Sequence, residues 1–205
     1  MKVKVNLLAL TGFGNQALKA LLKHKKKVHV LGLYTREENG KFPYYDEEDI
    51  KELAGRHNIK TYLIPKKGPW DIGPKADINL IATFHRILNG KHLRRARRNI
   101  NIHPSLLPSY RGPTPTNWMI HNEEKLCGLT AYLLTDKIDS GDIIYQKAYP
   151  LSFADDPALR RYLAKRVGAA VDFLIDNFPD YRKRESPYKE SYYPSFYNIK
   201  NRKKK

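Results

Sequence analysis

Short apolar stretches that alternate with helix-like stretches constrain the fold of this chain more than any other feature. Residues 77–84 are nearly continuous in apolar side chains, as in a parallel strand buried on both faces. Residues 16–24 instead carry apolar side chains at helical spacing. Further strands are expected at 2–10, 28–34 and 60–64 and in a segment ending at His103, with another helix at 47–57. This alternation predicts an α/β fold, a Rossmann-like doubly wound and mostly parallel sheet.

The pattern changes after His103. Thr114-Pro115 predicts a helix start, with proline at the first helical position. Residues 126–134 and 143–149 are predicted strands joined by a loop. From Asp155-Asp156-Pro157 we expect one long amphipathic helix that covers the sheet. We therefore expect one domain over residues 1–178 and a basic C-terminal tail over 179–205, rich in Tyr, Pro and Lys and either wrapping or partly disordered.

Composition narrows the class of protein. A chain of 205 residues with 41% hydrophobic residues can bury the core of a single domain. No apolar run approaches the roughly 20 residues of a membrane helix, and the first residues enter a strand directly, without the features of a signal peptide. Cys127 is the only cysteine, which excludes an intrachain disulfide and a metal site built from cysteines. These features predict a cytoplasmic protein without membrane contact.

The positive charge is large and uneven. The net charge is +17, and residues 1–36 hold eight Lys/Arg and no acidic residue. Residues 85–98 are also basic and free of acids, and the chain ends in Lys200-Asn-Arg-Lys-Lys-Lys205. One interpretation is attraction of a phosphorylated small molecule or a nucleic acid. The other is a solvated basic surface, and charge alone does not decide between them.

Three polar side chains with complementary chemistry are expected at strand ends. Asn101 and His103 lie two residues apart in Asn101-Ile-His103-Pro-Ser-Leu-Leu-Pro108, so an extended strand points both to the same side. Asp139 follows 36 residues after His103 in a Ser-Gly turn sequence. Open α/β sheets place ligands at the carboxyl ends of their strands. The amide can donate to an oxyanion, the imidazole can move a proton, and the carboxylate can hold the imidazole or order a water.

These motifs, together with Arg111-Gly112, resemble those of the formyltransferases that use N10-formyltetrahydrofolate. That family includes glycinamide ribonucleotide transformylase, methionyl-tRNA formyltransferase and the sugar N-formyltransferases. The resemblance is strongest over residues 80–146 and implies the formyltransferase fold, an enzyme that uses this folate as formyl donor, and no metal. It also implies that Asn101, His103 and Asp139 form the catalytic triplet. Taken singly, each of the three is equally explained as a turn or strand-end residue.

The resemblance further implies residues for the two substrates. Phe84, Arg86, Ile87 and Leu88 would hold the pterin ring of the donor, with Thr135 and Ile138 in a second wall, although Ile87 and Leu88 could simply be core residues. On the acceptor side the expected residues are Gly12, Gly14, Ser105 and Arg111. Ser105 and Arg111 could equally stabilise their loop. The turn at Gly12 also weakly matches a dinucleotide-binding pattern.

The motifs of this chain resemble those of family members that formylate different acceptors. Arg111-Gly112 and Asp139-Ser-Gly-Asp142 are similar to the sugar and methionyl-tRNA enzymes, whereas the purine enzymes usually have proline where Asp142 stands. The methionyl-tRNA enzymes carry a further C-terminal domain, for which the residues after Phe178 are too few, although the basic tail could partly substitute. A phosphorylated small-molecule amine, first of all a nucleotide-linked amino sugar, is therefore expected, with tRNA and glycinamide ribonucleotide as alternatives.

The sequence alone also fits three other classes of protein. A formyltetrahydrofolate hydrolase would add an N-terminal regulatory domain. A basic nucleic-acid-binding protein on the same scaffold would bind with a steep salt dependence and without folate. A dinucleotide-dependent oxidoreductase would bind its cofactor at residues 12–17. The long helix or the 126–149 region could serve an oligomer interface, but no pattern selects that state.

Overall fold

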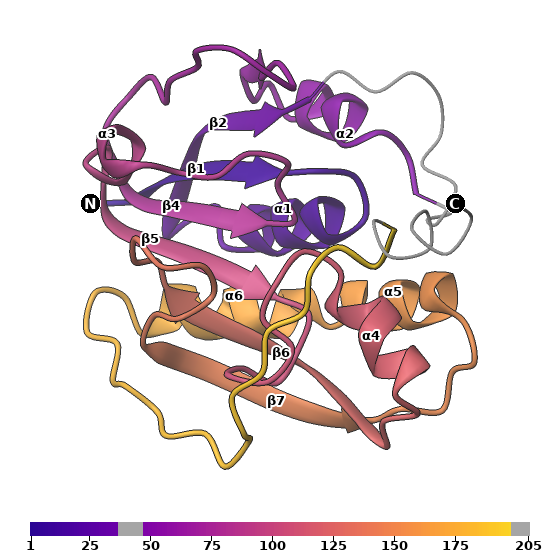
Figure 1. Cartoon of the computed structure of the whole chain (residues 1–205). Coiled ribbons are helices and arrows are strands. Elements are labelled where there is room, and N and C mark those ends of the chain that lie inside the picture. Colours follow the sequence, from indigo (N-terminus) through magenta and orange to yellow (C-terminus); the bar gives the residue numbers. More distant parts are fainter. Residues whose placement is uncertain (37–46, 198–205) are drawn as a thin grey trace.

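A computed structural model describes residues 1–36 and 47–197 of the chain. Within these residues, seven strands form one sheet in the order β3-β2-β1-β4-β5-β6-β7 (Figure 1). Their bounds are β1 Val3–Ala9, β2 Val28–Thr35, β3 Thr61–Leu63, β4 Ala76–Ala82, β5 Ala96–His103, β6 Leu126–Leu133 and β7 Ile143–Pro150. The first five strands are parallel, β6 pairs antiparallel with β5, and β7 pairs antiparallel with β6. The predicted mostly parallel sheet is confirmed.

Successive residues of the central strands point into two different cores. On β1, Leu7 belongs to the larger core and Leu8 to the smaller one, because neighbouring side chains leave opposite faces of a strand. The larger core lies under α1 (Phe13–Lys23), α2 (Ile50–Arg56), α5 (Asp156–Ala164) and α6 (Val167–Asp176). Continuous apolar stretches therefore form the centre of the sheet, since both of its faces are covered.

The smaller core is closed by the segment between β3 and β4 and by the short helix α3 (Gly90–Leu93). His92 of α3 is almost fully buried and stacks on Trp70, with ring centroids 3.9 Å apart. Its Nε2 donates to the Trp70 carbonyl at 3.1 Å, and its Nδ1 accepts the Asn89 amide at 3.2 Å. Burial lowers the pKa of His92 below its usual 6.5. The imidazole is thus a neutral, hydrogen-bonded part of this core.

The long helix expected after Asp155 is two helices, α5 and α6, separated at Lys165 and Arg166. In a continuous helix the Arg166 amide would donate to the Tyr162 carbonyl. Here the Arg166 guanidinium donates to that carbonyl at 2.8 Å, and the Arg166 amide donates to Leu163 instead. The side chain thus bonds to the carbonyl to which the amide would donate in a continuous helix, at the point where α5 ends and α6 begins.

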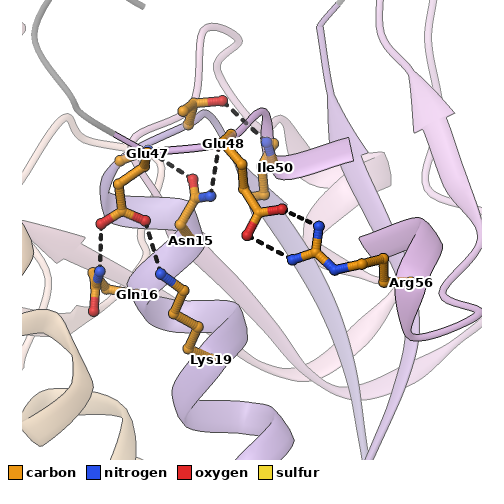
Figure 2. Close-up of polar contacts among 9 residues, drawn as sticks. Asn15, Gln16, Lys19, Glu47, Glu48, Ile50 and Arg56 are labelled. Carbon is orange, nitrogen blue, oxygen red and sulfur yellow. Dashed lines mark hydrogen bonds and ion pairs between the residues drawn. The ribbon is translucent and has the colours of Figure 1, made fainter. Parts of the chain in front are cut away.

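Helix α1 is fixed at its start by polar contacts with the segment that leads into α2 (Figure 2). Asn15 accepts the Gly12 amide and donates to the Glu48 carbonyl, at 2.8 and 2.9 Å. Gln16 and Lys19 both contact the Glu47 carboxylate. Gly14 packs so closely that an added Cβ would lie 2.5 Å from the Ile50 Cδ1 and 2.7 Å from the Ala9 Cβ. Within this structure the glycine at 14 serves the close packing of α1 on β1 and α2.

The described part of the C-terminal tail lies against the domain. It passes β7, where the Arg184 amide donates to the Ile143 carbonyl, and continues to α4 (Pro115–His121), where the Trp118 indole donates to the Pro194 carbonyl (Figure 1). We call residues 184–196 the strap. The part of the predicted tail after residue 197 lies outside the described residues. In the described residues, no helix has the length and apolar character needed to cross a membrane.

Cys127 lies on β6 with its side chain fully buried in the larger core. Burial raises the pKa of its thiol to about 11. The described residues contain no group of three or more His, Cys, Asp or Glu side chains that could hold a metal ion.

Candidate active site

A cavity of about 420 Å³ opens at the carboxyl ends of β4 and β5. Its walls come from the segment after β4, the end of β5, the loop before α4 and the segment that runs from the end of β6 to Asp139. The three predicted catalytic residues, Asn101, His103 and Asp139, all line it. The structure therefore brings the three side chains to one cavity, at the sheet edge where their strand positions placed them.

A tyrosine that the motif did not indicate joins two of these residues. Tyr132 of β6 lies directly opposite Asn101 of β5 in the antiparallel pair. Its hydroxyl donates to Asp139 Oδ1 at 2.7 Å and accepts from Asn101 Nδ2 at 3.0 Å. Because the single hydroxyl proton goes to the carboxylate, the nitrogen of Asn101 must face the tyrosine. Burial and the Asp139 charge raise the pKa of Tyr132 well above its usual value, so the hydroxyl keeps its proton.

His103 is buried and held through its Nε2 atom. That nitrogen lies 3.0 Å from the Tyr110 carbonyl, which can only accept, so Nε2 carries a proton. In the neutral imidazole Nδ1 is then the basic nitrogen. It lies 3.8 Å from Asp139 Oδ2, too far for a direct hydrogen bond but close enough to stabilise a positive charge on the ring.

Asp139 is positioned by its turn and by a backbone donor. Its φ of 48° is left-handed, and the carboxylate accepts the Gly112 amide at Oδ2 over 2.8 Å. An added Cβ at Gly141 would lie 1.6 Å from the Leu133 carbonyl oxygen, so the turn after Asp139 requires glycine at that position. With Tyr132 and Gly112 as donors, both oxygens of the carboxylate have partners in a largely buried place.

The residues predicted for the formyl donor also line the cavity: Phe84, Arg86, Ile87, Leu88, Thr135 and Ile138. Ile87 and Ile138 expose 76% and 53% of their surface, which identifies them as wall residues rather than core residues. Arg86 donates to the carbonyls of Pro65 and Gly68, at 2.6 and 2.8 Å. Its side chain therefore fixes the segment after β3 beside this wall.

The residues predicted to bind the acceptor lie outside the cavity wall. Within the described residues, the cavity wall does not include Gly12, Gly14, Ser105 or Arg111. Ser105 is buried and donates to the Ser109 carbonyl at 2.8 Å, and Arg111 pairs with Glu190 of the strap. On the wall are instead Thr116, buried and with its hydroxyl unpartnered among the described residues, and Arg160, which pairs with Asp156.

Sequence reasoning missed Tyr132, Gly112 and the Tyr110 carbonyl. Tyr132 is in a strand that was predicted, but only the pairing register with β5 shows that it faces Asn101. Gly112 was noted only as part of the Arg111-Gly112 motif, and the motif does not show that its amide donates to the Asp139 carboxylate. The signals for these contacts lie in long-range pairing and not in any local motif.

Comparison with known proteins bears on this site. The family model for formyl transferases matches residues 73–167, which contain Asn101, His103 and Asp139. This match confirms the resemblance to the formyl transferase family. The methionyl-tRNA formyltransferase of Parabacteroides distasonis is 34% identical over 122 residues, 57% of this chain and 38% of that one. The chain spans about half the length of the curated relatives it matches.

Solved structures of formyl transferases share the fold. A 4-N formyltransferase from Francisella tularensis superposes with a TM-score of 0.71 at 19% identity, covering 97% of this chain and 78% of that one. An N-formyltransferase from Helicobacter canadensis, in complex with folinic acid and dTDP-3-aminofucose, gives 0.68 at 20% identity and covers 94% and 71%. At these identities the likeness shows the fold, and the site of this chain has to be argued from its own residues.

Proposed function

We propose that the chain transfers the formyl group of N10-formyltetrahydrofolate to a primary amine. The observation that carries the proposal is the linked set of Asn101, Tyr132, Asp139 and His103 on the wall of one cavity. It supplies an amide donor, a basic nitrogen and a carboxylate, which are the groups that acyl transfer to an amine needs.

In the proposed reaction the amine nitrogen attacks the formyl carbon, and an oxyanion develops on the formyl oxygen. Among the described residues only one of the two Asn101 amide hydrogens has a partner, so the other can donate to this oxyanion. His103 Nδ1 accepts the proton lost by the amine, and Asp139 stabilises the imidazolium. The bond between the formyl carbon and N10 then breaks, and the proton passes to N10 of the departing tetrahydrofolate.

The donor is assigned to the wall formed by Phe84, Arg86, Ile87, Leu88, Thr135 and Ile138. The supporting observations are the exposed apolar side chains there and the folinic acid bound by the Helicobacter canadensis protein of the same fold. A planar pterin ring suits a cavity with apolar walls and backbone polar groups.

For the acceptor we propose a nucleotide-linked amino sugar. The net charge of +17 and the presence of Arg160 and Thr116 on the cavity wall support an anionic, hydroxyl-bearing acceptor. The resemblance of Asp139-Ser-Gly-Asp142 to the sugar and methionyl-tRNA enzymes supports the sugar over glycinamide ribonucleotide. We do not extend the proposal to Arg111, because its guanidinium pairs with Glu190 outside the cavity.

A methionyl-tRNA acceptor is the second candidate. It is favoured by the similarity to methionyl-tRNA formyltransferases, including those of Parabacteroides distasonis and Lactobacillus johnsonii. A protein that neutralises several phosphates of an RNA loses affinity steeply as salt rises, whereas binding of a nucleotide sugar changes less. The salt dependence of the acceptor KM therefore separates the two candidates.

The decisive experiment measures tetrahydrofolate release from N10-formyltetrahydrofolate with a panel of amines. The panel holds nucleotide-linked 3-amino and 4-amino sugars, glycinamide ribonucleotide and methionyl-tRNA. We expect turnover with one of the amino sugars. Turnover only with methionyl-tRNA would overturn the choice of acceptor, and absence of both turnover and donor binding would overturn the proposed function.

Variants test the roles in the same assay. His103→Ala and Asp139→Ala should each lower kcat by on the order of 100-fold or more, because proton transfer loses its base or its stabilising charge. Donor binding should persist in both variants. His57→Ala, an exposed histidine at the end of α2, is the matched control and should keep the parent rate. A parent-like kcat in His103→Ala would contradict the mechanism.

A further inference from the structure

Both backbone groups that hold the His103–Asp139 pair lie on one three-residue segment. The Tyr110 carbonyl accepts the proton of His103 Nε2, and the Gly112 amide donates to Asp139 Oδ2. The orientation of the base and of its carboxylate therefore depends on the path of the backbone from Tyr110 to Gly112.

That segment is held in turn by the strap, about 80 residues later in the chain. The Arg111 amide donates to the Ser191 carbonyl at 3.0 Å, and the Tyr193 amide donates to the Arg111 carbonyl at 2.9 Å. The two chains thus form a parallel bridge between Arg111 and Tyr192. Every backbone polar group of Arg111 is used by the strap.

Side chains add to this bridge. The Tyr110 amide donates to Ser191 Oγ at 2.9 Å, and the rings of Tyr110 and Tyr193 stack with centroids 5.0 Å apart and planes 13° apart. Glu190 pairs with the Arg111 guanidinium. The strap itself is anchored away from this point, because Ser186 donates to the Leu107 carbonyl and the Phe196 amide donates to Thr114 Oγ1.

The strap approaches the 110–112 segment closely because residue 112 is a glycine. Gly112 has a φ of 113°, and an added Cβ would lie 2.1 Å from the Tyr193 carbonyl oxygen. Only glycine allows both this backbone conformation and this distance. Tyr192, whose two neighbours bond to Arg111, exposes 58% of its surface and lines the cavity.

We propose that strap residues 190–193 are a positioning element of the active site, which fixes the Tyr110 carbonyl and the Gly112 amide and through them orients His103 and Asp139. Ser191 and Tyr193 act through the backbone, and Tyr192 adds a ring to the cavity wall. The proposal rests on the proposed formyl transfer for its effect on rate, but its effect on structure can be measured without any reaction. The strap also lies beyond the residues that the family model matches.

The test compares two shortened chains with the full chain. A chain ending at Lys189 removes the positioning residues, and a chain ending at Tyr197 keeps the strap and is the matched control. We expect the chain ending at Lys189 to bind N10-formyltetrahydrofolate within about threefold of the full chain, with kcat lowered on the order of 100-fold, as misplacement of catalytic groups does. The chain ending at Tyr197 should keep the full rate. A parent-like kcat for the chain ending at Lys189, or an equal loss of donor affinity and rate, would overturn the proposal.

Ser191→Ala provides a milder change if the chain ending at Lys189 is poorly folded in a thermal unfolding test. It removes only the hydroxyl that accepts the Tyr110 amide, so a several-fold fall in kcat with unchanged donor affinity is expected. The pH profile should shift with it, because the basic nitrogen is held less well. An unchanged kcat and pH profile would count against the role of Ser191.

Hydrogen exchange separates failure of this inference from failure of the proposed function. The Gly112 amide donates to Asp139 and not to the strap. Its exchange in the chain ending at Lys189, or in Ser191→Ala, therefore reports whether the strap holds the site, even if no amine is turned over. We expect exchange at least tenfold faster than in the full chain. Unchanged protection of Gly112 would refute the inference whatever the activity.

Discussion

At the scale of single residues, Tyr132 makes the site one connected unit. Its hydroxyl is the only atom that bonds to both Asn101 and Asp139 among the described contacts. The tyrosine is almost fully buried, so either partner left without it would lose a hydrogen bond in a place that water reaches poorly. The Asn101 amide and the Asp139 carboxylate are thereby kept at fixed positions relative to each other.

Tyr132→Phe should therefore impair both stability and transfer. Loss of the hydroxyl leaves buried polar groups unpaired, which costs about 1–3 kcal/mol in the free energy of unfolding. We expect kcat to fall on the order of 100-fold, with donor affinity little changed. Tyr145→Phe, on β7 and outside the cavity wall, is the matched control for the assay. Equal kcat values for the two variants would show that the bridge does not orient the site.

The sequence pointed to the three candidate catalytic residues but not to the groups that hold them in place. Asn101, His103 and Asp139 stand in local motifs, so their types and spacing could be recognised before any fold was known. Tyr132 and Glu190 could not be found in this way, because one acts through strand register and the other through a pairing 79 residues away. Arg111 was expected either to bind the acceptor or to stabilise its loop, and its ion pair with Glu190 in the tail favours the second role.

At the scale of elements, the packing of α1 explains the glycine at the start of this helix. Gly14 lies against Ile50 of α2 and Ala9 of β1, and the side chain of Asn15 bonds to both the turn and the Glu48 carbonyl. The glycine pattern was interpreted as a possible phosphate-binding turn. The observed contacts explain the glycine at 14 by helix packing alone.

Gly14→Ala should destabilise the protein by about 1–3 kcal/mol, since the added methyl group overpacks a closed contact. Gly55→Ala is the matched control on α2, where an added Cβ meets nothing within 4 Å. Because alanine favours a helix more than glycine does, this control should stabilise by about 0.5–1 kcal/mol. Chemical unfolding of both variants measures the difference. A stable Gly14→Ala variant would refute the packing explanation.

The division between α5 and α6 shows why an apolar stripe cannot locate every helix end. The stripe runs on from Leu159 to Ile175, and both helices bury it. At the break, the side chain of Arg166 donates to the Tyr162 carbonyl while its amide donates to the Leu163 carbonyl. Such a contact leaves no trace in the periodicity of apolar residues.

At the scale of the whole molecule, stability depends on pH through the buried His92 of the smaller core and the half-buried His85 at its border. Burial lowers the pKa of His92 and of His85 below the usual 6.5. The unfolded chain therefore binds protons at these sites more readily than the folded one. Their contribution to stability is fully present above pH 6.5 and decreases as the pH falls below that value.

We expect the free energy of unfolding to decrease between pH 6.5 and 5, before most carboxylates titrate. His92→Gln should make this decrease shallower, whatever its effect on stability at neutral pH, because one of the proton-binding differences is gone. The double variant with His85→Gln should be shallower still. Chemical unfolding at several pH values measures the slopes, and the same slope in the parent and both variants would contradict the assignment.

The burial of Cys127 has a practical consequence for labelling. Only the thiolate reacts readily with a maleimide dye, and this thiol, with a pKa of about 11 and no exposed surface, offers almost none at neutral pH. A cysteine introduced at the exposed rim position Ile138 would thus carry the dye alone, without first replacing Cys127. On the proposed function, the fluorescence of such a probe would report binding of the folate donor in real time.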